Sequence, residues 1–240
     1  MLVLAKLNKY MNFSFKSLFD NMLKPEVRVD PAIFNDPLAL KTSWNPLQGG
    51  GASFRTHEAV QASANRIEFR ATPFSYVMLM IPVTFTFLFP ILLIGRNLSE
   101  NGGLVLNRDS FWGVAIAVIC GFVSVFGYRY IQGSIIFDRS YGYFWKGKRN
   151  KIGEAFDPAQ QKESVRLGEV HALQIIHEWI SGSGKRSRPY KSYELNLVLR
   201  SGERMNVVDH GNKKRLLEDA NQLAQFLNVP VWDGSANMLM

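Results

Sequence analysis

The basic side chains of this chain are the residues with the clearest potential for binding, and they gather in short segments. One group lies in the Ser- and Gly-rich stretch 181–189, and a second group opens a predicted helix. Each cation near an anionic leaflet contributes about 1 kcal/mol of binding, and cations at a helix N-terminus oppose the macrodipole, which can mark a binding surface. We therefore take six residues as candidates for lipid or partner binding: Lys185, Arg186, Arg188, Lys213, Lys214 and Arg215.

This interpretation has a simpler alternative, because any domain next to the cytoplasmic face of a membrane tends to be basic. Four further cations, Lys146, Lys148, Arg149 and Lys151, follow a predicted span and fit that alternative equally well. The positive charge of the C-terminal half is modest, so we expect no nucleic-acid partner.

Patterns that indicate catalysis or metal binding are weak. Asp209 and His210 could form half of an acid–base pair, but they lie at a predicted strand-to-helix turn, where such residues commonly bond the local backbone. His171 and His177 would lie about 20 Å apart on a strand, too far to share a metal ion. Gly49–Gly51 is not followed by the Lys-Ser/Thr of a phosphate loop, so we interpret it as a flexible joint. We predict no enzyme and no cofactor.

Two apolar stretches, 74–94 and 111–131, dominate the hydropathy of a chain of 240 residues that is 47% apolar. At about 1.5 Å per residue each covers the roughly 30 Å of a hydrocarbon core, so we predict two membrane spans. A buried pair of core helices is the alternative, but so small a protein offers few partners to bury them. Arginines and lysines flank the outer ends of the pair, whereas the link 96–110 is balanced in charge. This asymmetry predicts that both termini are cytoplasmic.

Small residues repeat along the second stretch, at Gly113, Ala117 and Gly121. Such a stripe lets two helices approach closely in lipid. It predicts packing against the first stretch, with a homodimer as the alternative. Pro82 and Pro90 are tolerated in a membrane helix, and we expect them to kink it.

Period-2 alternation predicts strands on both sides of the spans. The expected strands are 54–61 and 66–72 before the spans, and 133–138, 142–146, 170–180, 192–200 and 203–209 after them. An amphipathic helix is expected over 212–228, and Pro230 follows it.

Seven antiparallel strands and a closing helix are the inventory of a pleckstrin-homology-like fold. The fold class expected is therefore an α+β membrane protein with a two-helix transmembrane hairpin inserted after the second strand. A five-stranded domain with an unrelated hairpin before it is the alternative. The expected divisions are an amphipathic helix and Pro/Gly linker over 1–51, a hairpin over 52–73, the spans over 74–131, the β domain over 132–234 and a tail over 235–240.

Several motifs resemble a group of uncharacterised bacterial two-span membrane proteins with such a domain. They are NPLQGGG at 45–51, FRTH at 54–57, FDR at 137–139, GYFWKG at 142–147, YELNLVL at 193–199, NVVDHG at 206–211 and VPVWD at 229–233. The resemblance covers roughly residues 42–234 and implies no particular activity. LAQFLNVP at 223–230 is also similar to the photosystem I assembly factor of chloroplasts and cyanobacteria, which implies an assembly or scaffolding role.

These observations favour a bacterial inner-membrane protein that presents a cytoplasmic interaction or scaffolding domain to a protein partner. The alternative function is recognition of anionic lipid head groups through Lys185, Arg186 and Arg188.

Overall fold

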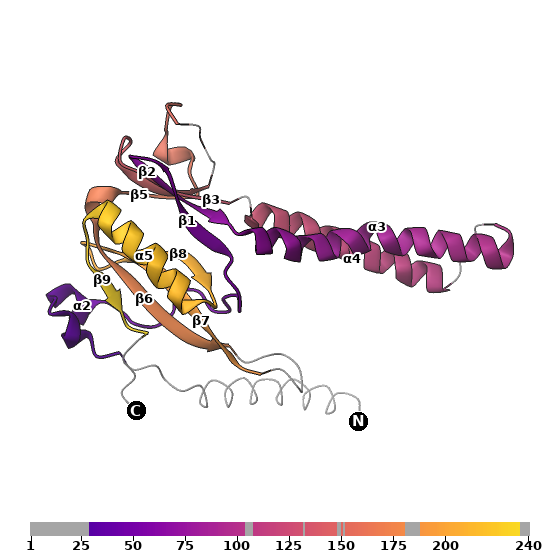
Figure 1. Ribbon diagram of the computed structural model, residues 1–240, viewed down its shortest axis with the longest axis horizontal. Coiled ribbons are helices and arrows are strands. Elements are labelled where there is room, and N and C mark those ends of the chain that lie inside the picture. Colours follow the sequence, from indigo (N-terminus) through magenta and orange to yellow (C-terminus); the bar gives the residue numbers. More distant parts are fainter. Residues whose placement is uncertain are drawn as a thin grey trace, which may run out of the picture.

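The computed structural model describes residues 29–103, 108–131, 133–147, 150, 152–180 and 188–235. It is an α+β protein in which a β domain carries a long pair of apolar helices (Figure 1). The amphipathic helix expected within 1–28 lies outside the described residues, as do Lys185 and Arg186.

The helices and strands follow the expected order. The helical elements are η1 (Pro31–Phe34), α2 (Pro37–Lys41), α3 (Pro73–Asn101), α4 (Arg108–Ile131), η2 (Pro158–Gln160), η3 (Leu167–Glu169) and α5 (Lys213–Leu227). The strands are β1 (His57–Ser63), β2 (Arg66–Ala71), β3 (Ser134–Asp138), β4 (Tyr143–Gly147), β5 (Glu163–Arg166), β6 (Val170–Ile180), β7 (Tyr190–Leu199), β8 (Arg204–His210) and β9 (Val231–Asp233). β5 and β9 were not expected, because strands of four and three residues are too short to show alternation.

The first sheet, sheet A, is antiparallel with the order β1-β2-β3-β4-β5. β2 pairs with β3, and Ile67 lies opposite Phe137, although α3 and α4 separate the two strands along the chain. The helix pair is therefore inserted between neighbouring strands of one sheet, and the alternative of an unrelated N-terminal hairpin is wrong.

The second sheet, sheet B, has the order β8-β7-β6-β9, with β9 parallel to β6. Helix α5 lies across the β domain and contributes Leu216, Ala220 and Leu223 to the same core as Ile67 of sheet A and Leu195 of sheet B (Figure 1). Its apolar stripe is the one predicted from the sequence.

Residues 29–51 form a packed cover on sheet B, whereas the sequence suggested an extended linker. The Phe34 and Trp44 rings stack with centroids 5.1 Å apart, and Trp44 lies 6.2 Å from the ring of Trp232. The backbone N–H groups of Leu47 and Gln48 donate to the Glu194 carboxylate, and those of Gly50 and Gly51 donate to Glu178. Prolines in this segment begin η1 and α2, so they shape the cover instead of keeping it extended.

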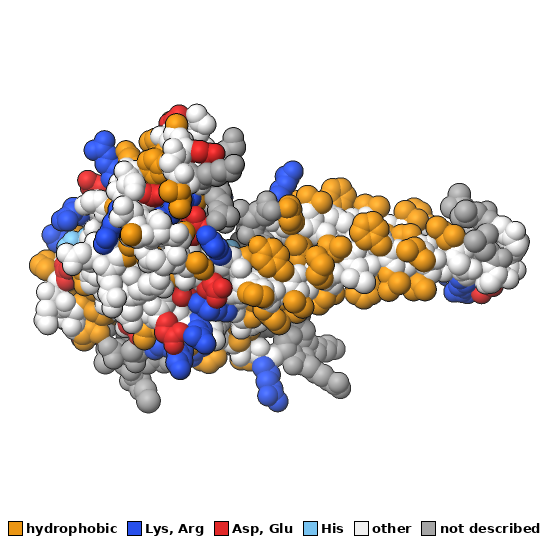
Figure 2. All heavy atoms as spheres, turned by 45° about the horizontal axis from the view of Figure 1, so that its top comes forward, with side chains coloured by type: hydrophobic (Ala, Val, Ile, Leu, Met, Phe, Trp, Pro, Cys, Tyr) orange, Lys and Arg blue, Asp and Glu red, His pale blue; other side chains and the backbone are white. Residues whose placement is uncertain are grey.

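Helices α3 and α4 are long and apolar enough to cross a membrane. Only 6% of the first apolar stretch and 11% of the second is buried within the protein, so they are not core helices of the β domain. Figure 2 shows hydrophobic side chains along the visible face of the pair, with charged side chains at its two ends. α3 continues through both Pro82 and Pro90.

The small-residue stripe of α4 lies against α3 of the same chain. A Cβ atom at Gly113 would overlap the Leu93 side chain, and one at Gly121 would lie 3.7 Å from the Thr86 methyl. Ala117 between them is buried. Close approach of these two helices is thus the role that the structure gives to the stripe.

Candidate functional site

The junction between the β domain and the helix pair is fixed by short side-chain bonds. The Thr72 hydroxyl lies 3.4 Å from the Ser75 N–H at the start of α3, and the Ser75 hydroxyl donates to the Thr56 carbonyl at 2.7 Å. The Thr56 hydroxyl in turn donates to the Asp209 carbonyl at 3.1 Å. α3 is therefore tied to the segment that enters β1 and, through it, to β8, so the helices leave the domain in a defined direction.

A polar pocket of about 300 Å³ lies beside this junction, between the two sheets and next to the end of α4. Its cations come from three separate segments: Arg129 from α4, Lys146 from β4 and Lys162 from the loop before β5. Glu163 and Asp209 supply the acidic groups. Tertiary folding alone brings these five side chains together.

Lys146 is the most buried of the three cations. Its ammonium donates to Oδ1 of Asn206 at 3.1 Å, and it forms no ion pair with a residue that the structure describes. Burial lowers the pKa of Lys146, and the acidic neighbours Glu163 and Asp209 only partly oppose that effect. An anion bound in the pocket would replace the water that this ammonium has lost.

Two further titratable groups at the pocket, Asp209 and His57, have pKa values shifted toward their neutral forms. Burial, reinforced by the nearby Glu194, raises the pKa of Asp209 to about 7, although Asn206 donates to its carboxylate at 2.8 Å. Burial lowers the pKa of His57 to about 4, and Lys146 adds to that effect. At neutral pH positive charge therefore predominates in the pocket.

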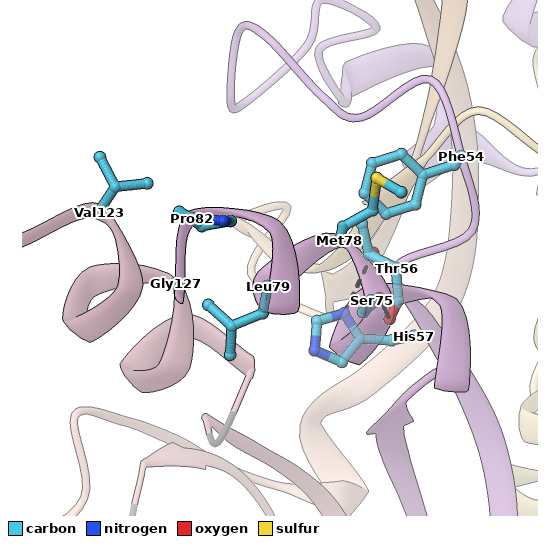
Figure 3. A pocket seen from close by; sticks show the side chains of 9 residues that line it. All are labelled: Phe54, Thr56, His57, Ser75, Met78, Leu79, Pro82, Val123 and Gly127. Carbon is cyan, nitrogen blue, oxygen red and sulfur yellow. Dashed lines mark hydrogen bonds between the residues drawn. The ribbon is translucent and has the colours of Figure 1, made fainter. Parts of the chain in front are cut away.

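An apolar pocket of about 210 Å³ lies at the base of the helix pair (Figure 3). Figure 3 shows Phe54 and His57 on the side of the β domain and Val123 and Gly127 on α4. α3 contributes Met78, Leu79 and Pro82. His57 lines both this pocket and the polar one, so the two adjoin.

Gly127 keeps room in the apolar pocket. A Cβ atom there would lie 2.8 Å from Cδ1 of Leu79, which is itself part of the lining. A larger side chain at this position would extend into the pocket or push Leu79 into it.

The predicted basic residues that the structure describes line neither pocket. Lys185 and Arg186 are outside the described residues, and Arg188 is exposed just before β7. Lys213 lies 3.7 Å from Asp233 in an ion pair, and Lys214 is exposed.

Arg215 at the start of α5 has local partners. Its side chain pairs with Glu218 at 2.8 Å, and its backbone N–H donates to the Asn212 side chain, which caps the helix. Ion pairs and a cap thus offset the unfavourable position of the cations at this helix N-terminus.

The start of α5 and the β6–β7 hairpin meet around one buried histidine. Lys191 and Lys213 both lie close enough to His177 to lower its pKa, after the larger effect of burial. Figure 1 shows this end of the hairpin on the side from which α3 and α4 leave the domain.

Asp209 and His210 do not form an acid–base pair, because consecutive strand residues point to opposite faces. Asp209 lines the polar pocket, whereas His210 is fully buried and its Nδ1 accepts from the Asn212 N–H at 3.3 Å. His171 contacts Asp36 at 2.7 Å. Among the described residues, no three His, Cys, Asp or Glu side chains are placed to hold a metal ion.

Sequence reasoning treated Lys146 as one of several basic residues after a span, and it did not single out Lys162 or Asn206. A lysine inside the aromatic strand Tyr143–Gly147 was the available signal. Nothing near Lys162 in the sequence indicates that it lines the same pocket.

No protein-family model matches this chain, and comparisons with curated proteins and with solved structures find no significant match. Function is therefore inferred from the fold and the site.

Proposed function

We propose that this chain is an integral protein of the bacterial inner membrane. In this proposal α3 and α4 form a transmembrane hairpin and hold a pleckstrin-homology-like β domain at the cytoplasmic surface. The exposure of the apolar helices supports it, as do the aromatic rings of Trp112 and Tyr128, which lie about 24 Å apart along α4 and suit the two interfaces. The pleckstrin-homology-like fold is supported by two sheets of mostly antiparallel strands that α5 closes. β5 and β9 are additions to the seven strands expected of that fold.

The orientation follows from the charges at the two ends of the helix pair. The described residues at the tip include Arg96 and Arg108, whereas Arg66, Arg70, Arg129 and Arg139 flank the helices on the side of the β domain. The positive-inside rule then places the domain in the cytoplasm.

The function supported best is binding of anionic lipid head groups by the β domain. One observation carries it: Arg129, Lys146 and Lys162 line a pocket at the point where the helices enter the domain. That point is at the level of the head groups if the hairpin spans the bilayer. Lys213, which lies close to His177 of β6, and Arg188, which is exposed just before β7, would add to the attraction.

The test is lipid retention by the full-length protein in mild detergent, measured by native mass spectrometry after incubation with equal amounts of phosphatidylglycerol and phosphatidylcholine. We expect the protein to retain more phosphatidylglycerol than phosphatidylcholine. The double variant Lys146→Gln, Lys162→Gln should reduce the ratio of the two retained lipids by roughly 25-fold, at about 1 kcal/mol per cation. Lys41→Gln, an exposed cation on α2 away from the helices, is the matched control (Figure 1). Equal retention of both lipids by the unmodified protein contradicts the proposal.

A second candidate is the protein-interaction role expected from the sequence. Ile33 and Leu40 on the cover of sheet B are 44% and 61% exposed and offer an apolar contact far from the helix pair. Photo-crosslinking in cells from position 40, compared with position 214, tests it. A discrete protein adduct from position 40 alone supports this role, and adducts to lipid alone from both positions count against it.

A further inference from the structure

We propose that the polar and apolar pockets form one site for a single anionic phospholipid, with its phosphate in the polar pocket and part of one acyl chain in the apolar pocket. This inference rests on the proposed head-group function and specifies the ligand class. It distinguishes a resident membrane lipid from a soluble phosphate compound.

The polar and apolar pockets are continuous with each other. The two pockets share His57, and their volumes are about 300 and 210 Å³. Each is at or below the lower end of the roughly 300–1,000 Å³ typical of small-molecule sites, whereas together they fall inside that range. One ligand that is polar at one end and apolar at the other fits this arrangement.

The position of the apolar pocket suits a lipid acyl chain. The apolar pocket is lined by the first turns of α3, including Met78 and Pro82, and by Val123 and Gly127 in the last turns of α4. An acyl chain could therefore enter it from the hydrocarbon region beside the helices. A soluble ligand would leave this apolar surface unfilled.

The charge of the polar pocket suits a phosphodiester. Three cations face Glu163 and Asp209 in the polar pocket, and among the residues that the structure describes the Lys146 ammonium has one hydrogen-bond partner, Asn206. A phosphodiester brings one negative charge and several acceptor oxygens to this set. A choline head group would bring an additional cation beside the three.

The experiment compares phosphatidylglycerol with glycerol 3-phosphate on the full-length protein, again by native mass spectrometry. We expect the lipid to be retained and a hundredfold excess of glycerol 3-phosphate to displace less than about a tenth of it. Gly127→Leu fills the apolar pocket and should reduce the retained lipid at least about tenfold. Gly95→Leu is the matched control, because a Cβ atom there meets nothing within 4 Å; it should stay within about twofold.

The outcomes separate the two proposals. If glycerol 3-phosphate displaces the lipid fully, or if Gly127→Leu and Gly95→Leu retain equal lipid, the bipartite site is refuted while head-group binding stands. If phosphatidylglycerol is retained no better than phosphatidylcholine and Lys146→Gln changes nothing, both proposals fail. The glycerol 3-phosphate competition uses the unmodified protein, so it does not depend on the folding of a variant. Crosslinking of Met78 by a lipid that carries a diazirine in its acyl chain reports directly where the acyl chain lies.

Discussion

Replacing Asp209 with Asn tests how the polar pocket is built, because this carboxyl is held in a surrounding that favours its neutral form. Its pKa rises from 3.8 to about 7, mainly through burial and then through Glu194. The folded protein thus binds this proton more tightly than the unfolded chain does. The free energy of unfolding should therefore fall as pH rises from about 4 to about 7, and the full cost is present above pH 7.

The size of that cost follows from the two pKa values. At 1.36 kcal/mol per pH unit, a rise from 3.8 to about 7 corresponds to about 4 kcal/mol. The carboxyl is only half-buried, so solvent screening reduces this to about 2–4 kcal/mol. Asp209→Asn keeps the shape and an acceptor for Asn206 while it removes the charge, so it should recover most of that free energy at pH 8.

The assay is thermal unfolding of the full chain in detergent at pH 4.5 and pH 8. We expect Asp209→Asn to raise Tm by about 4–16 °C at pH 8, at about 2–4 °C per kcal/mol for a chain of this size, and to change it little at pH 4.5. Other titrating groups act equally on both proteins, so the difference isolates Asp209. Asp30→Asn is the control, because Asp30 is exposed and Asn caps η1 equally well.

A lower Tm for Asp209→Asn at pH 8 would refute the reasoning, because it would mean that Lys146 stabilises the carboxylate more than burial disfavours it. Equal differences at the two pH values would also refute it, since the effect would then not depend on ionisation.

Three further predictions concern the rest of the domain. Asp219→Ala removes the buried carboxylate whose two oxygens accept from Nη2 of Arg55 at 2.8 Å and leaves Arg55 with its more exposed partner Glu58. This change should cost about 3 kcal/mol in denaturant unfolding, whereas Glu218→Ala on an exposed pair should cost under about 1 kcal/mol. Trp232→Ala should cost about 3–5 kcal/mol and make residues 29–51 accessible to limited proteolysis. Burial lowers the pKa of His210 to about 4, so the folded protein holds this imidazole neutral. The free energy of unfolding should therefore be unaffected by His210 above pH 6.5 and should decrease as pH falls from 6.5 toward 4. His210→Gln should flatten that part of the curve of unfolding free energy against pH.

The sequence alone determined the elements whose signals are local. Two charge-free stretches marked α3 and α4 to within a few residues at their domain ends, and the stripe of apolar residues marked α5. Period-2 alternation, a long apolar run and turn residues between segments located seven of the nine strands in the described residues. These signals are visible because each depends on neighbours a few residues apart.

Only the tertiary structure decided which of these elements meet. β2 and β3 pair across the inserted helices, and the cover 29–51 is bound through backbone N–H groups that donate to Glu194 and Glu178. A backbone donor has no signature in the sequence, so the prolines and glycines of this segment indicate a linker, whereas the structure has a packed cover. The candidate site also depends on tertiary structure, because Arg129, Lys146 and Lys162 come from three separate segments. The shifted pKa values of Lys146 and Asp209 arise mainly from burial, which only the folded chain creates.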